Sequence, residues 1–333
     1  MDERRAAILR AVVEGYIETA QPVGSASVAR EHDLKVSPAT IRNEMVALEQ
    51  DGYLVQPHTS AGRIPTDKGY RFFVDSFVPG PGQLDLARRQ QVSSFFTKAH
   101  GAIEDMLQST SRLLSNLTDY AAVVVGPSRE EARIRSVQLV GLAPRVALVV
   151  AVLENGVVEK TSIDLADEIG DERIAAATAH LASCLVGSSL RSLEDPRPSG
   201  DPLLDDLCKT AASSLRTVHS EEPSPVFVGG ASHMAHAFDA IETVRQVMST
   251  LEQQYVVVGL LKDVLDRGMT VSIGQEHDLQ SLAECSIVVA PYEVEGQLAG
   301  TIGVLGPTRM HYPEALAAVA VVSKRLGQRL TEG

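Results

Sequence analysis

The sequence of 333 residues contains no tryptophan, three cysteines and only 4% aromatic residues. The cysteines, Cys184, Cys208 and Cys285, have no paired spacing, which argues against a disulfide framework and against a zinc site. No apolar stretch reaches the ~18 to 20 residues that a membrane helix requires. The N-terminus does not combine a charged start with an apolar run, as a signal peptide does. We therefore expect a cytoplasmic globular protein of two or three domains, without a membrane partner.

Capping residues predict two consecutive helices within segment 22–77. Ser25 is a favoured cap for a short helix at 26–31. Ser37, followed by a proline that fits the first helical turn, begins a second helix at 38–51. A glycine directly after this helix suits a left-handed C-cap. Two helices joined by a tight turn are typical of a helix-turn-helix, although ordinary helical hairpins share the pattern.

The second of these helices has two different faces. Its core-facing stripe is Ile41, Met45 and Leu48, at i, i+4 and i+7. The opposite face carries small or hydrogen-bonding side chains and one guanidinium group: Ala39, Thr40, Arg42, Asn43 and Val46. Arginine binds guanine through O6 and N7, asparagine pairs with adenine, and small side chains contact the thymine methyl group. This face therefore suits the major groove of DNA.

A β-wing is predicted after the second helix. Residues 53–55 have the composition of a strand, residues 57–63 supply turn residues, and Ile64 resumes the apolar pattern. The tip, 59–63, combines hydroxyl groups, a glycine and a cation, which suits phosphate or minor-groove contact. Thr66 is placed to cap a last helix. The wing makes a winged helix-turn-helix, and with it DNA binding, the favoured interpretation over a helical hairpin.

Positive charge is scarce, since 30 Lys and Arg residues stand against 43 Asp and Glu residues and the net charge is −13. Residues 1–78 carry nine basic and eleven acidic residues, a net charge of −2, so the remainder carries −11. Few cations per protomer would meet the phosphates, so we expect a homodimer that doubles these contacts on a two-fold operator. We predict that Lys68 and Arg71 lie on the exposed side of the last helix. The residues that we predict to contact double-stranded DNA are Lys35, Ser37, Ala39, Thr40, Arg42, Asn43, Val46, Ser60, Gly62, Arg63, Lys68 and Arg71.

The rest of the chain reads as a β-rich domain with a helical insertion. A cluster of proline and glycine at 78–82 marks a boundary. Two helices are predicted next, at 84–99 and 103–117; the near-heptad spacing of the latter suits a helix packed on its own domain or a coil that spans a dimer. Predicted strands are 122–125, 134–142, 145–153, 157–163, 226–228, 270–273, 285–292 and 298–304, with Asn155-Gly156 as a hairpin turn. Residues 168–218 are predicted to be mainly helical, as are 235–254, 255–267 and 313–330.

Signals for chemistry in this larger part are weak. His233, His236 and Asp239 fall at i, i+3 and i+6 on a predicted helix, a spacing that suits a metal but is more often a solvated or partly buried pair. Gly229-Gly230 lacks the remaining residues of a phosphate loop and reads as a tight strand-to-helix turn. Cys285-Ser286 lacks a nucleophile elbow. We therefore expect no cofactor and no enzymatic activity.

With these motifs in place, the chain resembles the HrcA family of heat-inducible transcription repressors over essentially its whole length. The resemblance rests on four motifs: Gln21–Ser25, Ser37–Met45, His58–Thr66, and Gly303–Met310 with Tyr312. The sequence departs from the family pattern in the stretch Ile273–His277, where His277 stands at the position at which we expect asparagine.

The resemblance implies an α+β protein, with a winged helix-turn-helix, a GAF-like α/β domain and a helical dimerisation insertion. We place the winged helix at 1–78, the GAF-like domain at 79–165 and 220–333, and the insertion at 166–219. It also implies repression of chaperone operons through an inverted-repeat operator, with a GroEL-type chaperonin that maintains the active form and is diverted by heat.

Two other classes of protein stay open from the sequence. One is a repressor that senses a small molecule, because GAF-like domains often bind ligands. The other is a metal-dependent enzyme that uses His233, His236 and Asp239. A ligand-induced thermal shift together with a changed operator affinity would favour the first, and absence of bound metal by elemental analysis would remove the second.

Overall fold

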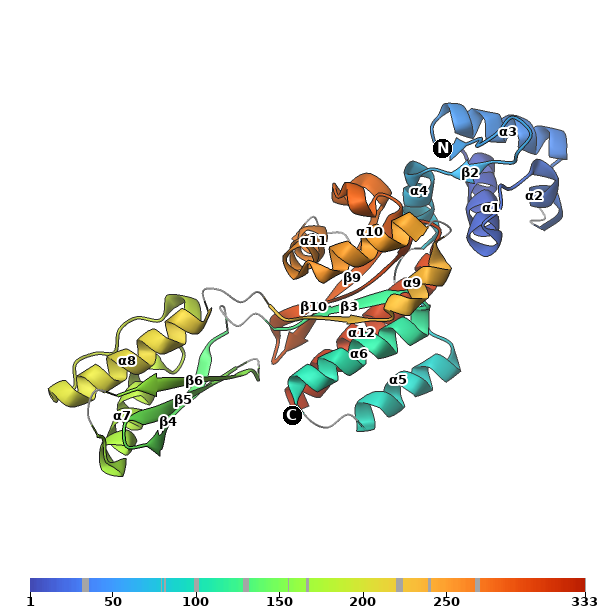
Figure 1. The fold of residues 1–333 in the computed structure, drawn as a ribbon. Coiled ribbons are helices and arrows are strands. Elements are labelled where there is room, and N and C mark those ends of the chain that lie inside the picture. The colour runs from blue at the N-terminus through green and yellow to red at the C-terminus, as the bar shows by residue number, and fades with distance from the viewer. Residues whose placement is uncertain are drawn as a thin grey trace.

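The computed structural model describes residues 1–332 except 32–35, 79, 81, 99–101, 128–131, 155, 166–167, 220–223, 239–240 and 267–269. The described elements form three groups along an elongated molecule (Figure 1). A helical N-terminal segment lies at one end, a five-stranded sheet covered by helices lies in the middle, and a three-stranded sheet with two helices lies at the other end.

The N-terminal segment consists of four helices and a short hairpin. Its elements are α1 (Glu3–Thr19), α2 (Ser25–Glu31), α3 (Pro38–Gln50), β1 (Leu54–Val55), β2 (Ile64–Pro65) and α4 (Asp67–Phe77). The Ser37 side chain accepts a hydrogen bond from the Thr40 N–H, and Gly52 has a left-handed backbone with φ +77°. Both ends of α3 therefore agree with the capping predictions.

One capping prediction is wrong by a residue. Helix α2 already includes Ser25, and the Gly24 carbonyl accepts the first hydrogen bonds, from the N–H groups of Ser27 and Val28. Glycine tolerates the N-cap position well, so the helix begins one residue before the serine that we took as its cap.

The central sheet has the strand order β7-β3-β10-β9-β8, and all its neighbouring strands are antiparallel. Its strands are β3 (Ala121–Val125), β7 (Val226–Gly229), β8 (Val271–Ile273), β9 (Cys285–Val294) and β10 (Gln297–Pro307). Helices α5 (Leu86–Lys98), α6 (Ile103–Thr118) and α12 (Tyr312–Glu332) lie on one side, and α9 (Ala231–Ala237), α10 (Ile241–Glu252) and α11 (Gln254–Asp266) lie on the other (Figure 1). Two short 3₁₀ turns, η2 (Gly274–His277) and η3 (Gln280–Leu282), connect β8 to β9.

Both faces of this sheet are buried. In β3, alternate residues belong to two different apolar clusters, Ala122 and Val124 on the side of α6 and α12, and Val123 and Val125 on the side of α10 and α11. A continuous apolar strand is the pattern expected when helices cover both faces. Where the sequence predicted one helix at 235–254, the structure has the two helices α9 and α10.

The third group contains β4 (Ile134–Ala143), β5 (Val146–Leu153), β6 (Val158–Asp164), α7 (Asp171–Leu185), the 3₁₀ turn η1 (Leu190–Ser192) and α8 (Pro202–His219). The three strands form their own antiparallel sheet, and their core cluster includes residues of α7 and α8. The unit that lies apart from the central sheet therefore spans 134–219, and the predicted boundary between 165 and 166 falls inside it. Apolar alternation identifies a strand but does not specify which sheet the strand joins.

Helices α7 and α8 cover only one face of this small sheet. Along β5, Ala147, Val149, Ala151 and Leu153 are buried, while Val146, Leu148, Val150 and Val152 alternate with them and are partly exposed. Of the predicted hairpin turn after β5, Asn155 lies outside the described residues, and Gly156 has φ +84°. Among the helices that the structure describes, none is long and apolar enough to cross a membrane.

Candidate nucleic-acid interface

The outer face of α3 is exposed as predicted. Ile41, Met45 and Leu48 are buried against the N-terminal core, whereas the side chains on the opposite face point to solvent. Exposed on that face are Ser37, Ala39, Arg42, Asn43 and Val46, and Thr40 is half-buried, with its hydroxyl group 3.0 Å from the Ser37 hydroxyl group. The helix therefore presents one guanidinium group, one amide and small side chains on a convex surface.

A buried carboxylate holds α3 from behind. Glu44 is 9% exposed, and Arg5 donates from Nε to its Oε2 over 2.8 Å. Arg4 pairs with the other carboxylate oxygen. These hydrogen bonds, chiefly the one from Arg5, lower the pKa of Glu44, so the carboxylate stays charged. Sequence reasoning missed this residue, whose only local signal is an acid within an otherwise basic and apolar part of the helix.

The base of the β1–β2 hairpin is fastened to the segment before α2. Val23 and Arg63 exchange two backbone hydrogen bonds, each of 2.9 Å. Gly62 approaches this bridge so closely that a Cβ atom there would lie 2.4 Å from the Val23 carbonyl oxygen. The Gln56 side chain closes the tip by donating to the carbonyl oxygens of Thr59 and Ala61. Ser60 is exposed at this tip, as predicted.

The guanidinium group of Arg63 does not extend freely from the hairpin. Its Nε lies 3.0 Å and its Nη2 2.9 Å from Oε2 of Glu49 on α3, and the side chain is 11% exposed. Arg63 therefore joins the hairpin to α3 instead of forming the free cation that the tip composition predicts. The acceptor lies 14 residues away in the chain, so the tip composition gave no indication of it.

Lys68 is exposed, but its ammonium group contacts other groups of the protein. Its Nζ donates to the Asp51 carbonyl oxygen over 2.8 Å and lies 4.4 Å from the centre of the Tyr53 ring. It thus satisfies a carbonyl group at the C-terminal end of α3, where a cation is favourable. The predicted contact residue Lys35 lies outside the described residues.

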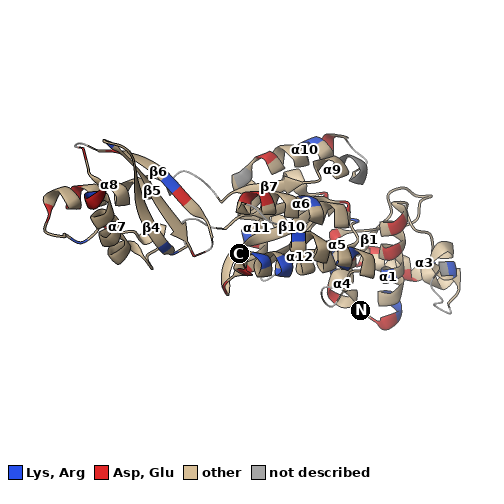
Figure 2. Ribbon diagram, turned by 90° about the horizontal axis from the view of Figure 1, so that it is seen from below, with Lys and Arg blue, Asp and Glu red and all other residues tan. Residues whose placement is uncertain are grey.

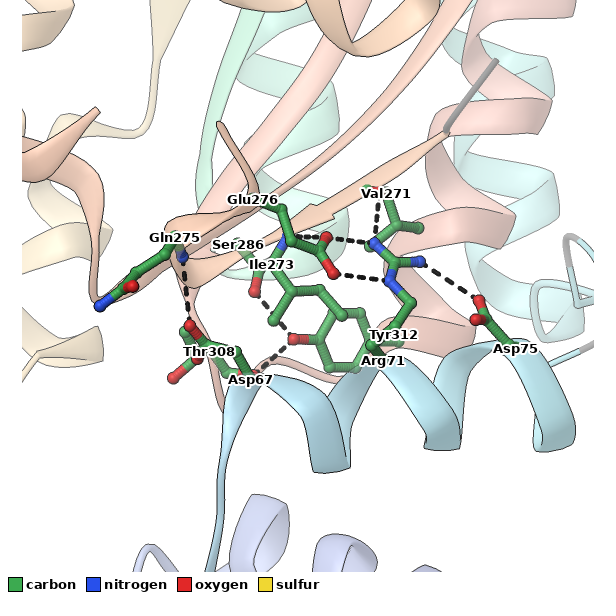
Figure 3. Close-up of polar contacts among 10 residues, drawn as sticks. All are labelled: Asp67, Arg71, Asp75, Val271, Ile273, Gln275, Glu276, Ser286, Thr308 and Tyr312. Carbon is green, nitrogen blue, oxygen red and sulfur yellow. Dashed lines mark hydrogen bonds and ion pairs between the residues drawn. The ribbon is translucent and has the colours of Figure 1, made fainter. Parts of the chain in front are cut away.

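Arg71 differs most from its prediction. Its side chain is a quarter exposed, and Figure 3 shows it directed from α4 towards the central domain. Both Nε and Nη2 donate to the Glu276 carboxylate, and Nη2 also donates to the Val271 carbonyl oxygen over 2.8 Å. The hydrogen bond with Glu276 raises the pKa of Arg71, against the effect of burial. The expectation that Arg71 lies on the exposed side of the helix is therefore wrong, because its acceptors come from a loop 200 to 205 residues away in the chain. Its contact with DNA stays a prediction.

Other contacts join α4 to the same loop. Oδ2 of Asp67 accepts a hydrogen bond from the Gln275 N–H over 3.1 Å (Figure 3). Gly274, with φ +56°, lies so close that a Cβ atom would overlap the Asp67 carboxylate at 2.1 Å. Behind these polar contacts, the buried rings of Tyr70 and Tyr312 pack with their centres 6.0 Å apart. The N-terminal segment and the central domain consequently share one apolar cluster.

The motif Gly303–Met310 with Tyr312 supports this packing. The Tyr312 hydroxyl group donates to the Thr308 carbonyl oxygen over 2.6 Å and lies 2.8 Å from the Ser286 hydroxyl group (Figure 3). Burial raises the pKa of Tyr312, so the phenol stays protonated. His277, at the position that departs from the family pattern, directly follows Glu276 and is buried, and desolvation lowers its pKa.

The electrostatic character of the N-terminal segment is mixed. Figure 2 shows acidic and basic residues interleaved over α1 and α4. Of the five predicted DNA-facing cations, Arg63, Lys68 and Arg71 contact protein acceptors, and Arg42 is exposed. Three of the predicted contact cations are thus paired with protein acceptors in this structure.

Of the three candidate metal ligands, the structure describes the side chain of His233. Nδ1 of His233 lies 3.6 Å from the Asp119 carboxylate, while the side chain of His236 and all of Asp239 fall outside the described residues. Within the described part of the chain, no three His, Cys, Asp or Glu side chains are grouped as metal ligands. Burial raises the pKa of Cys208 to about 11 and that of Cys285 to about 12, so both thiols are protonated and unreactive.

Between the central sheet and α10 and α11 there is a small apolar gap. It has a volume of about 10 Å³ and is lined by aliphatic side chains such as Val123, Leu261 and Leu305. This volume is about the minimum for a single water molecule. The gap therefore offers no room for a small-molecule effector in this conformation.

The chain is similar to known proteins over its whole length. Residues 104–316 match the family model described as HrcA protein C terminal domain. The heat-inducible transcription repressor HrcA of Streptomyces avermitilis is 38% identical over 100% of this chain and 99% of its own, and that of Moorella thermoacetica is 36% identical over 100% and 98%. The crystal structure of a hypothetical protein superimposes with a TM-score of 0.67 and 24% identity, covering 100% of this chain and 99% of that one, so the fold is shared.

Proposed function

Because this chain belongs to the HrcA family of heat-inducible transcription repressors, we propose that it is a DNA-binding repressor of chaperone operons. In this proposal α2 and α3 form a helix-turn-helix, the β1–β2 hairpin is its wing, and α3 enters the major groove. The observation that carries the proposal is the exposed outer face of α3, where Arg42 and Asn43 lie beside small side chains. Arginine and asparagine are the side chains best suited to read guanine and adenine.

The predicted contact residues have different roles in this proposal. Arg42, Asn43, Ala39, Thr40 and Val46 read base edges, and Ser37 and Ser60 contact phosphates together with the backbone around Gly62. Lys68 and Arg63 orient α3 and the wing and reach phosphates only by giving up their protein acceptors. Phosphate contacts fix the position of the protein on the duplex, and base contacts specify the sequence.

We assign the domains as a winged helix at 1–78, a GAF-like domain formed by the segments on either side of the small sheet, and a dimerisation insertion at 134–219. The separate core cluster of 134–219 supports this limit of the insertion. A GAF-like arrangement is supported by the five-stranded antiparallel sheet with helices on both faces.

The uncovered face of the small sheet is the proposed dimer contact. It carries the partly exposed residues of β5 and, on the neighbouring strands, Val140 and Val158, which are 43% and 46% exposed. Lys160 and Asp164 lie on the same face, opposite Val150 and Val146 respectively. An apolar centre flanked by charges of both signs suits a self-complementary two-fold contact, in which a lysine of one copy faces an aspartate of the other.

Heat sensitivity follows if the active dimer is marginally stable. A change of ~1.4 kcal/mol in the free energy of the active form alters its equilibrium population tenfold. An operator held by few contacts per protomer is then released when a GroEL-type chaperonin no longer maintains the active form. No catalytic group takes part in this mechanism.

The test is a gel-shift titration at fixed salt with an inverted-repeat duplex from a chaperone promoter, a scrambled duplex, and both again with added chaperonin. We expect selective binding that chaperonin strengthens. Arg42→Ala should lose ~1–3 kcal/mol and relax the preference at one base pair in each half-site. Arg245→Ala, on exposed α10, is the matched control and should bind as the native chain does. A lack of selective binding in both conditions would refute the proposal and favour a ligand-sensing protein.

A further inference from the structure

The joint between α4 and the loop 271–277 connects the proposed reading head to the rest of the molecule. It contains two independent polar contacts, Arg71 with Glu276 and Asp67 with the Gln275 N–H. Asp67 and Arg71 lie one turn apart on the same side of α4, so their two contacts together fix both the position and the rotation of this helix. Figure 3 shows both contacts directed towards the end of the central sheet.

The acceptor side of the joint is itself held in place. The Glu276 carboxylate accepts the Ile273 N–H over 2.8 Å in addition to the arginine. A two-pronged arginine–carboxylate contact restricts orientation more strongly than a single hydrogen bond. Because Nη2 of Arg71 also reaches the Val271 carbonyl oxygen, the guanidinium group bridges the start and the end of the short segment from β8 to η2.

The aromatic contact behind the joint does not replace these polar contacts. Tyr70 and Tyr312 are buried, but they meet at a tilted interplanar angle of 52° without a hydrogen bond between them. Apolar packing stabilises the association of α4 with the sheet and decides which face of the helix is buried, but it is less directional than a hydrogen bond. The polar contacts therefore restrict the rotation of the helix further.

We infer that Asp67, Arg71 and Glu276 are positioning residues that set the operator spacing, by fixing how each reading head is held within the dimer. This inference rests on the proposed function. In a dimer, the second half-site is bound intramolecularly, and this advantage is lost when the two heads cannot reach both half-sites together. A fixed joint therefore accepts one spacing, whereas a loose joint accepts several with lower affinity for each.

The experiment compares the full-length native chain with the double variant Asp67→Ala, Arg71→Gln, which removes the acceptor of the Gln275 N–H and the donors to Glu276. The probes are the inverted-repeat duplex, the same duplex with two or five base pairs added between the half-sites, and a duplex with one half-site. Five added base pairs turn one half-site by about half a helical turn. For the native chain we expect this insertion to weaken binding ~100-fold, the loss expected when simultaneous engagement is abolished.

For the double variant we expect weaker binding to the native spacing and a spread of less than about threefold over the three spacings, with unchanged affinity for the single half-site. Arg71→Lys, which retains the charge but not the fork, should give an intermediate spread. Arg88→Gln removes a comparable ion pair with Glu314 that links α5 to α12 and does not involve α4, so it should keep the native profile.

The outcomes separate the inference from the function on which it rests. If the native chain selects no duplex, the proposed function fails. If the native chain is spacing-selective and the double variant keeps the same profile, the joint does not set the spacing. Should the double variant fail to fold by circular dichroism, Gly274→Ala tests the same joint from the other side, because its Cβ atom displaces the loop from Asp67 without altering residues 1–78.

Discussion

Gly62 provides the sharpest test of how the proposed wing is built. Substitution of Gly62 by alanine places a Cβ atom 2.4 Å from the carbonyl oxygen of Val23 and 2.5 Å from the carbonyl carbon of the same residue. Because these are backbone atoms, no side-chain rotation relieves the clash. The hairpin must move away, which breaks the two 2.9 Å hydrogen bonds between Val23 and Arg63. Each is worth ~0.5–1.5 kcal/mol net, so local opening of the wing should become easier by ~1–3 kcal/mol.

Hydrogen exchange measures this local opening directly. In the native-state exchange regime, ~1–3 kcal/mol corresponds to ~5- to 150-fold faster exchange of the Val23 and Arg63 amides. Gly80→Ala is the control, because Gly80 is exposed and has no atom within 4 Å of its Cβ position. Unchanged protection of the Val23 amide in Gly62→Ala, with the chain folded, would refute the account of the wing as a clamped hairpin.

Three further outcomes are expected. Val150→Asp, on the uncovered face of the small sheet, should convert the proposed dimer into a monomer in analytical ultracentrifugation while the circular dichroism spectrum is unchanged; a dimer that persists would place the contact elsewhere. Tyr312→Phe removes a buried hydroxyl group that contacts Thr308 and Ser286, and should lower the free energy of unfolding by ~1–3 kcal/mol in guanidinium titrations. The pKa of His277 is lowered by desolvation, so below about pH 6.5 the unfolded chain binds the proton more readily and stability falls as pH decreases, by at most ~1.4 kcal/mol per pH unit. His277→Asn should reduce this difference between pH 7.5 and 5.5, and an equal difference in both chains would contradict the assignment.

Local signals predicted the elements of the N-terminal segment well. Ser37, Gly52 and Thr66 act on backbone groups within a few residues, and each has the predicted capping role in the structure. The exposure of α3 also followed from periodicity, because a helix with one apolar stripe must turn the other side to solvent. These features depend only on the neighbouring sequence.

Features that depend on distant partners were not predictable in this way. Arg63 and Arg71 are of a residue type that often contacts phosphate, yet each is paired with a glutamate on another element. In sequence, β5 is as continuously apolar as β3 of the central sheet, and only strand pairing assigns β4 to β6 to the insertion. Pairing is set by contacts between residues far apart in the chain, which a single sequence does not specify.

The pairing of three predicted contact cations with protein acceptors changes the physical account of the proposed operator binding. With Arg63, Lys68 and Arg71 committed to protein acceptors, each reading head has little electrostatic attraction of its own, in a chain of net charge −13. A head with few phosphate contacts binds weakly and with a shallow salt dependence. Under the proposed function, useful affinity then arises from holding two heads at the operator spacing, so the residues that fix the geometry matter as much as those that touch DNA. In that proposal Arg71, which composition assigns to the DNA backbone, contributes to binding by orienting its own helix through Glu276.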